Sequence, residues 1–244
     1  DGRASSDPSG QTLTYSWRIA SRPSGSTSQL SSTTSSTPTF VADVSGEFLV
    51  CLVVTDSEGC SSAEDCVRIV VAPRVKLHIE LTWNTNNSDI DVHYRAPNGT
   101  FFHRFTPPPN CGNGDAKDVW YCRKRPDWGL NGEGVPDGNN TNDPALDVDN
   151  ITGFGPENIN QDILFDGATD FTIGVHYYCD RGGAATNARI RVFVDGNPVF
   201  ESTRSLTRTQ FWEVANVRVT GNGTSVSVSG LNKALTTVTS PSCH

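Results

Sequence analysis

Four aspartates at alternating positions form the pattern in this sequence that most clearly points to chemistry. One residue separates Asp89 from Asp91, and one residue separates Asp147 from Asp149. Alternate side chains of a β-strand share a face, so each pair would project to one side of its strand. If the two strands approach each other, the carboxylates converge, and like charges that close must be protonated or neutralised by a cation. Ca²⁺ takes about 6 to 8 oxygen ligands, so the sequence predicts a structural calcium site.

Further oxygen donors lie near these aspartates in the sequence. The side chains that could complete the coordination shell are Asn84, Asn87, Asn150 and Glu157. The alternative is that the aspartates form solvated acidic faces or cap neighbouring turns. No EF-hand loop and no repeated Gly-Gly-x-Gly-x-Asp motif is present. His93 and His176 lie on separate predicted strands with no softer ligand nearby, so we interpret them as ordinary histidines rather than transition-metal ligands.

Seven cysteines indicate an oxidising compartment. They are Cys51, Cys60, Cys66, Cys111, Cys122, Cys179 and Cys243. None belongs to a Cys-x-x-Cys pair, which excludes the usual zinc and thioredoxin-type spacings. Together with abundant Ser, Thr, Asn and Gly, they favour an extracellular or cell-surface protein. Their odd number leaves one thiol free, bonded to another chain, or bonded outside this sequence.

Only part of the disulfide pairing follows from the sequence. Cys51 and Cys66 lie on consecutive predicted strands, so we expect them to pair across a hairpin. Cys111 and Cys122 could form a local staple, but either could instead reach Cys179. The candidates for a bond to the other domain or to another chain are Cys60, Cys179 and Cys243.

A long irregular stretch at residues 103–145 is rich in Pro, Gly, Asn and Asp and carries Trp120, Tyr121 and Trp128. Aromatic rings among polar residues are typical of sugar-binding surfaces, which makes these three residues candidates for polysaccharide binding. The alternative is a satellite core in which the rings pack beneath the loop.

No catalytic motif supports an enzyme. The chain lacks Gly-x-Ser-x-Gly, His-Glu-x-x-His, a P-loop and a dinucleotide fingerprint. A glycosidase would need two carboxyl groups at a defined separation, which sequence does not measure. We therefore expect a non-enzymatic protein.

Charge and composition exclude two further classes. The chain has 244 residues, with 19 Lys and Arg against 27 Asp and Glu and a net charge of −8. Without a basic run, nucleic acid is a poor partner. No apolar stretch approaches about 18 residues, so no membrane-spanning helix is expected. The chain has no Met and begins Asp1-Gly2-Arg3 without an apolar leader, so we expect a processed segment of an exported protein.

Period-two alternation runs along the chain, and helical periodicity is nearly absent, so we predict an all-β fold. The predicted strands cover residues 13–19, 47–55, 65–71, 75–83, 90–94, 170–178, 188–194 and 211–219. Asp195-Gly196 is a strong hairpin signal, and Asn98-Gly99 and Asn222-Gly223 are further turns. Pro73 lies between two predicted strands and marks a domain boundary, so we predict two β-sandwich domains, at residues 1–73 and 74–244.

A set of short motifs distinguishes the first domain. They are Asp-Gly-Arg-Ala-Ser-Ser-Asp-Pro-Ser-Gly at 1–10, Leu-Thr-Tyr-Ser-Trp at 13–17, Pro-Thr-Phe at 38–40 and Val-Val-Thr-Asp at 53–56. Together they resemble the PKD domain, an immunoglobulin-like sandwich that serves as a spacer, adhesive module or carbohydrate-associated accessory on exported proteins. The resemblance implies a core position for Trp17 and no catalytic residues.

The chain departs from the PKD pattern at its start. Family members carry a strand and a half before the Asp-Gly motif, whereas this sequence opens on that motif. A sandwich without its first strand offers unpaired backbone groups to another chain. We expect either an upstream segment or a neighbouring subunit to supply that strand.

A second set of motifs covers residues 75–220. They are Leu-Thr-Trp at 81–83, Asp-Ile-Asp-Val-His-Tyr at 89–94, Pro-Asn-Gly at 97–99, Leu-Asp-Val-Asp-Asn-Ile-Thr-Gly-Phe-Gly-Pro-Glu-Asn-Ile at 146–159, Phe-Thr-Ile-Gly-Val-His-Tyr-Tyr at 171–178 and Phe-Trp-Glu-Val at 211–214. The set resembles the bacterial YfaP-like family, which implies a β-sandwich on an exported protein and no established reaction.

These features lead to one expected function and one alternative. We expect a secreted structural and adhesive module that self-associates by strand complementation or disulfide, as in a filament, because head-to-tail contacts that do not close build fibres. The alternative is a carbohydrate-binding accessory region of a larger secreted enzyme.

Overall fold

The protein is all-β in the part of the chain that the computed structural model describes, and no helix occurs there. Those residues are 1–23, 25–72, 75–102, 117–129, 137–139, 141–151, 153–164, 170–182, 185–221 and 223–238. The chain forms two compact units, residues 1–72 and 73–244, one residue from the boundary expected at Pro73. None of the described residues forms a helix long and apolar enough to span a membrane.

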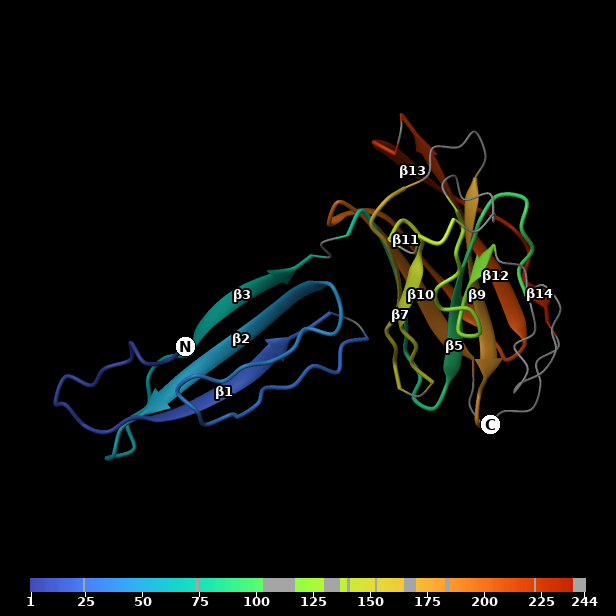
Figure 1. Ribbon diagram of the computed structural model, residues 1–244. Helices are drawn as coiled ribbons and strands as arrows, with labels where there is room; N and C mark the ends of the chain where they lie inside the picture. Colours follow the sequence, from blue (N-terminus) through green and yellow to red (C-terminus); the bar gives the residue numbers. More distant parts are fainter. Residues whose placement is uncertain are drawn as a thin grey trace. The chain divides into compact units, whose positions relative to one another are not determined.

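One antiparallel sheet organises the first unit (Figure 1). Its strands are, in spatial order, β1 (Thr14–Ser21), β2 (Gly46–Thr55) and β3 (Asp65–Val71). Trp17 is only 8% exposed, as a core residue should be, and its indole Nε1 donates to the Ser35 carbonyl at 2.8 Å. Its backbone N–H donates to the Thr33 carbonyl, so the irregular segment around residue 33 covers the outer edge of β1. Within the described residues, β3 keeps an open edge.

Two antiparallel sheets build the second unit. The first sheet contains, in spatial order, β11 (Asn197–Leu206), β10 (Thr186–Val194), β4 (Leu77–Trp83), β8 (Glu157–Gln161) and β7 (Ala145–Val148). The second contains β13 (Ser225–Gly230), β12 (Gln210–Thr220), β9 (Phe171–Cys179), β5 (Asp89–Arg95) and β6 (Asp118–Val119), with β14 (Thr236–Thr237) paired to β12. This arrangement confirms the predicted all-β class.

Apolar residues at every second position of β4 and β5 form the centre of the core in this unit. Ile79 and Leu81 on β4 and Ile90 and Val92 on β5 have no exposed surface and belong to one hydrophobic cluster. The alternation leaves the intervening residues of β5, the acidic ones among them, on the opposite face. The core therefore fixes the position of the acidic side chains.

The Asp195-Gly196 hairpin is confirmed, since these residues join β10 to β11 and have φ angles of 49° and 75°. Both values lie in the left-handed region that a tight hairpin turn requires. Asn98 also forms a turn with a φ of 57°. Asn222, Cys111 and Cys243 lie outside the described residues, as does the whole of the stretch at 103–116.

Candidate functional site

Three carboxylates come together where β5 begins. One oxygen each from Asp89, Asp91 and Glu157 lies within 4.8 Å of the other two. All three side chains are buried: 6%, 2% and 1% of their surfaces are exposed, respectively. The sequence predicted a metal site formed by the β5 aspartates with Asp147 and Asp149. In the structure the third carboxylate of the cluster is instead Glu157, which had been expected only as an additional oxygen donor.

The Gly-Phe-Gly-Pro-Glu-Asn segment delivers Glu157 to this position. Gly153 and Gly155 have φ angles of 104° and 88°, and a Cβ atom at Gly155 would come within 3.0 Å of the Leu81 carbonyl oxygen. Only glycine adopts such a backbone without strain while passing so close to β4. β8 begins directly afterwards, and the Glu157 Oε2 accepts the backbone N–H of Val92 at 2.7 Å. The side chain thereby links β8 to the edge of β5 in the facing sheet.

The two aspartates near β7 have different surroundings. Asp149 lies beside the cluster, where its charge raises the pKa values of Asp89 and Asp91, and its Oδ2 pairs with the Lys124 Nζ at 2.6 Å. Asp147 is exposed and accepts hydrogen bonds from Arg125 at 2.8 Å and from Asn160 at 2.6 Å. The metal-ligand prediction is therefore corrected for Asp147.

A bulge in β7 explains why Asp147 and Asp149 do not act as a pair. Leu146 lies opposite Ile159 and Val148 lies opposite the adjacent Asn158, so Asp147 is the extra residue of the bulge. A bulge interrupts the two-residue alternation on which the prediction depended.

The other expected oxygen donors also have structural roles. Asn84 Oδ1 accepts the backbone N–H of Asn187 at 2.8 Å, and Asn150 Nδ2 donates to the Gly155 carbonyl at 2.8 Å. Asn87 occupies a turn with a φ of 62°.

Burial and mutual repulsion oppose ionisation of the cluster. Burial raises the pKa of Asp89 to about 8, with repulsion from Asp91 and Asp149 adding to the shift and Arg181 opposing it. Burial likewise raises the pKa of Asp91 to about 7, an effect that His93 opposes and Asp149 reinforces. Burial also raises the pKa of Glu157, and the charge of Asp91 adds to it. A cation among these groups would reverse all three shifts.

Three buried carboxylate oxygens have no hydrogen-bond partner among the described residues. They are Asp91 Oδ2, Glu157 Oε1 and Asp149 Oδ1. The nearest histidine, His176, places its Nδ1 3.7 Å from Asp91 Oδ2, and burial lowers the pKa of His176 to about 3. A neutral imidazole does not balance the carboxylate charge. Buried carboxylate oxygens without partners are costly, so these atoms suit a bound cation.

A pocket of about 230 Å³ opens at the cluster. Its lining includes Asp89, Asp91, Asp149, Tyr121, Tyr178 and Arg181. Glu157 does not line this pocket and lies deeper in the unit. The carboxylates are thus accessible from one side.

A second buried polar pair lies farther along β5. His93 Nδ1 and Asp118 Oδ2 are 3.0 Å apart, and both side chains are fully or almost fully buried. The ring of Trp120 stacks on His93 with a centroid distance of 5.3 Å. Sequence reasoning missed Asp118 because it lies in a two-residue strand inside the irregular stretch. The pair is closed in by aromatic rings and does not reach the pocket.

The three aromatic candidates separate into different environments. Trp128 has no exposed surface and packs in the core, with its ring centroid 5.7 Å from that of Phe171, as in the alternative of packed rings and not on a ligand surface. Trp120 is half-buried against His93. Tyr121 is the one of the three that lines the pocket.

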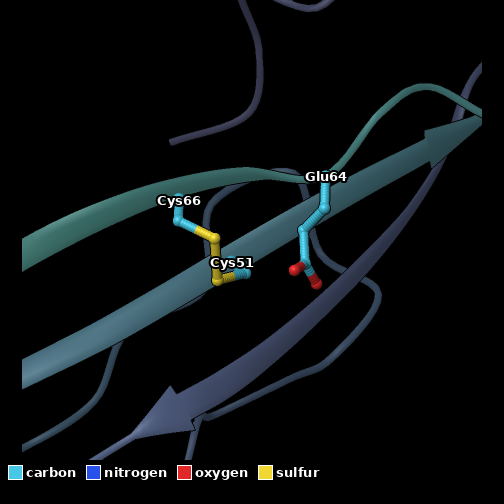
Figure 2. Close-up of side chains that lie close together, drawn as sticks. All are labelled: Cys51, Glu64 and Cys66. Carbon is cyan, nitrogen blue, oxygen red and sulfur yellow. A yellow bond between two sulfur atoms is a disulfide. The ribbon is translucent and has the colours of Figure 1, made fainter.

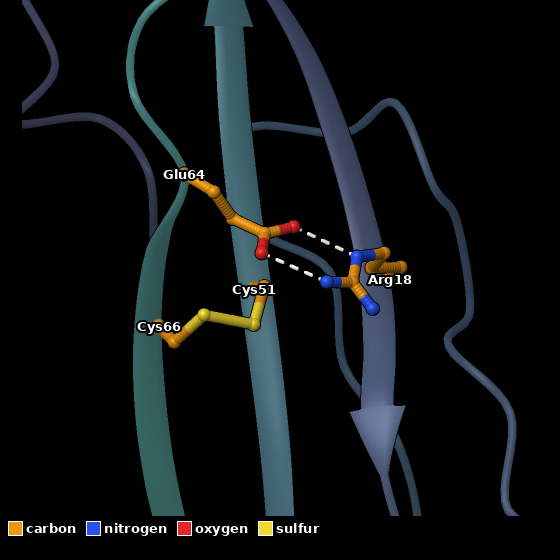
Figure 3. The surroundings of a disulfide bond; sticks show 4 residues. All are labelled: Arg18, Cys51, Glu64 and Cys66. Carbon is orange, nitrogen blue, oxygen red and sulfur yellow. Dashed lines mark hydrogen bonds and ion pairs between the residues drawn. A yellow bond between two sulfur atoms is a disulfide. The ribbon is translucent and has the colours of Figure 1, made fainter.

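Cys51 and Cys66 form a disulfide between directly opposite residues of β2 and β3, which is the pairing expected from the sequence. Figure 2 shows the Glu64 carboxylate beside it, a grouping of possible metal-ligand atoms. The two sulfurs are bonded to each other and so are not thiolate ligands. Figure 3 shows that both oxygens of Glu64 instead accept from Arg18, at 2.7 and 2.8 Å. This grouping is therefore structural.

The remaining described cysteines differ in state. Cys122 and Cys179 are disulfide-bonded, whereas Cys60 is free and exposed. Cys60 occupies the β2–β3 turn, where its N–H donates to Asp56 Oδ1 at 2.8 Å.

The first unit has the features expected of its sequence motifs, namely a buried Trp17 on β1 and a β2 that ends in Val-Val-Thr before Asp56. A family model described as "K319L-like, PKD domain" matches residues 1–71. This match supports the resemblance seen in the motifs of the first unit, which we call the PKD-like unit from here on.

Neither a curated protein nor a solved structure matches the chain. The resemblance of the second unit to the YfaP-like family stays a prediction. A PKD-like unit with a disulfide is typical of extracellular proteins.

Proposed function

We propose that this chain is a non-catalytic structural and adhesive module of an exported protein, and that its second unit is stabilised by calcium. The single observation that carries the calcium proposal is the buried set of Asp89, Asp91 and Glu157, with carboxylate oxygens that no described residue satisfies. The PKD-like unit supports the extracellular setting, where calcium is abundant enough for modules that bind it only at about 10⁻⁴ to 10⁻³ M.

The donor chemistry favours calcium over other cations. The cluster offers only oxygen atoms, whereas zinc and copper sites are usually built with histidine or cysteine. Mg²⁺ demands a near-ideal octahedron and retains several waters, which a tightly buried carboxylate set does not favour. Calcium tolerates irregular geometry and accepts several carboxylates.

The expected role of the ion is to join the two sheets of the second unit. Asp89 and Asp91 belong to β5 in one sheet, and Glu157 belongs to β8 in the other. Asp149 follows β7, so the ion would also restrain the loop that leaves this strand. Removal of the ion would leave like charges side by side where Glu157 of β8 meets the edge of β5.

Calorimetric titration with calcium tests the proposal. Asp91→Asn is expected to weaken calcium binding at least about tenfold, which corresponds to about 1.4 kcal/mol. Asp147→Asn is the matched control, because Asp147 carries the same charge two residues from Asp149 but lies outside the cluster. Absence of a calcium signal in the unmodified chain, or equal weakening by both substitutions, contradicts the proposal.

A second observation favours self-association through the PKD-like unit. The open edge of β3 carries Val67 and Val70, which are 52% and 65% exposed, and the free Cys60 lies in the adjoining turn. An exposed edge strand with apolar side chains is a template for pairing with another chain. We propose that a second copy pairs with this edge and that Cys60 can join the two copies covalently.

Light scattering after size-exclusion chromatography distinguishes association through strand pairing at β3 from association through a disulfide at Cys60. Unmodified protein is expected to elute as dimers or larger species, and Val70→Lys is expected to shift it to monomer by placing a charge on the edge. Reductant or Cys60→Ser is expected to remove only the covalently linked fraction. A monomer at every concentration and redox condition excludes this mode of association.

A further inference from the structure

The pocket beside the carboxylate cluster has room for a ligand as well as an ion. Its volume of about 230 Å³ lies below the roughly 300 Å³ at which pockets for drug-sized molecules begin, so it suits a single small ring. Asp89, Asp91 and Asp149 form its acidic wall, whereas Glu157 lies deeper. The opening is therefore on one side of the carboxylates only.

Calcium in this cluster would have coordination positions to spare. One oxygen from each of the three carboxylates lies within 4.8 Å of the other two, and the charge of Asp149 raises the pKa values of Asp89 and Asp91. Calcium takes about 6 to 8 oxygen ligands, more than one oxygen from each of these groups supplies. The remaining positions face the pocket because Glu157 occupies the buried side. Waters or the oxygens of a ligand must fill them.

Two tyrosines provide an apolar wall next to these positions. Tyr121 is half-buried, and its ring centroid lies 5.7 Å from that of Tyr178. The two rings are tilted by 55° to each other and pack together. Tyrosine rings combine an apolar face with a polar edge, which matches the alternation of C–H and O–H groups on a sugar.

Charge at the pocket selects between neutral and acidic ligands. The cluster and Asp149 together carry four negative charges when ionised. A divalent ion would balance two of these charges, and Arg181 and Lys124 would balance the others. Arg181 lowers the pKa of Asp89, and the Lys124 Nζ lies 2.6 Å from the Asp149 Oδ2. The site is then close to neutral, while the whole chain carries a net charge of −8. An acidic ligand gains nothing from the site and is repelled by the chain. A neutral ligand is favoured.

We propose that this pocket binds a neutral sugar, with two adjacent hydroxyl groups ligating the calcium ion and the ring lying against Tyr121. This inference rests on the proposed calcium site and adds its ligand class. The chain would then attach to polysaccharide only in the presence of calcium.

Saturation-transfer NMR on the full chain tests the inference after calcium binding has been measured by calorimetry. The probes are the methyl glycosides of mannose, galactose and fucose, each of which carries adjacent hydroxyl groups, and methyl 3-deoxymannoside, which lacks such a pair. At least one of the first three is expected to give a signal in calcium that EGTA abolishes. Methyl 3-deoxymannoside is expected to give none.

Substitutions at Tyr121 separate sugar binding from calcium binding. Tyr121→Ala is expected to weaken sugar binding at least about tenfold while the calcium titration stays unchanged, and Tyr121→Phe, which keeps the ring, is expected to retain it. The inference is overturned if calcium binds and no neutral glycoside gives a signal, if the signal persists in EGTA, or if methyl galacturonoside binds more tightly than the neutral glycosides. Failure of the calcium titration itself overturns the proposed function and this inference together.

Discussion

Calcium at a hundredfold excess over its dissociation constant is expected to stabilise the second unit by about 2.7 kcal/mol, because it binds the folded state and not the unfolded chain. The physical basis is the cluster of Asp89, Asp91 and Glu157, which the folded chain holds within 4.8 Å. Hydrogen exchange of the β5 and β9 amides measures this unit separately from the PKD-like unit. Protection in β5 and β9 is expected to rise with calcium and to return to its starting value in EGTA.

Two comparisons show whether the stabilisation comes from this cluster. Glu157→Gln removes one charge from it and is expected to abolish most of the calcium effect, whereas Asp147→Asn leaves the cluster intact and is expected to preserve it. Protection of the β2 and β3 amides in the PKD-like unit is expected to be independent of calcium. A calcium effect that is equal in both units, or unchanged in Glu157→Gln, contradicts the assignment.

The stability of the metal-free second unit is expected to fall as pH rises from about 4 to about 8. The pKa values of Asp89 and Asp91 in the folded chain, about 8 and about 7, lie above the value of about 3.9 of an unperturbed aspartate. Between these limits the folded state binds more protons than the unfolded chain, so its stability is full below about pH 4 and is lost as pH rises through the folded values. Calcium stabilisation should therefore be larger at pH 8 than at pH 6, which thermal unfolding with and without EGTA measures.

The strands that could be predicted from sequence are the long ones with a regular period. β4, β5 and β9 alternate apolar residues over seven or more positions, and the structure contains all three. The short strand β6 gave no comparable signal because it covers only Asp118–Val119. Its place in the sheet depends on long-range pairing, which local propensity does not encode.

The candidate site shows the same division between local and long-range information. Asp89 and Asp91 share a face because of strand alternation, and that inference needed no structure. Glu157 joins them from the facing sheet, a contact that depends on how the Gly155 turn passes β4. Asp147 is displaced by a bulge that becomes visible only in the register of β7 with β8. Residue type identified the chemistry, and tertiary pairing decided which carboxylates take part.

Removal of the Cys51–Cys66 disulfide by the double substitution Cys51→Ala and Cys66→Ala is expected to destabilise the PKD-like unit by about 3 kcal/mol. A cross-link that closes a loop of about 15 residues removes that much chain entropy from the unfolded state, and these two cysteines are separated by 15 positions. The effect should be large relative to the stability of the unit, because its 72 residues bury few large side chains, chiefly Trp17 and Phe48.

The disulfide also has a specific structural position, since it attaches the mostly exposed strand β3 to β2. Loss of the bond should therefore reduce hydrogen-exchange protection in β3 first and in β2 next, while β4 and β5 of the second unit stay unchanged. Cys60→Ala is the matched control, because this exposed thiol is free and its loss opens no cross-link within the chain. Equal protection of β3 in the double variant and the unmodified chain would mean that strand pairing alone holds the edge of this sheet, and that the disulfide contributes little to the stability of the PKD-like unit.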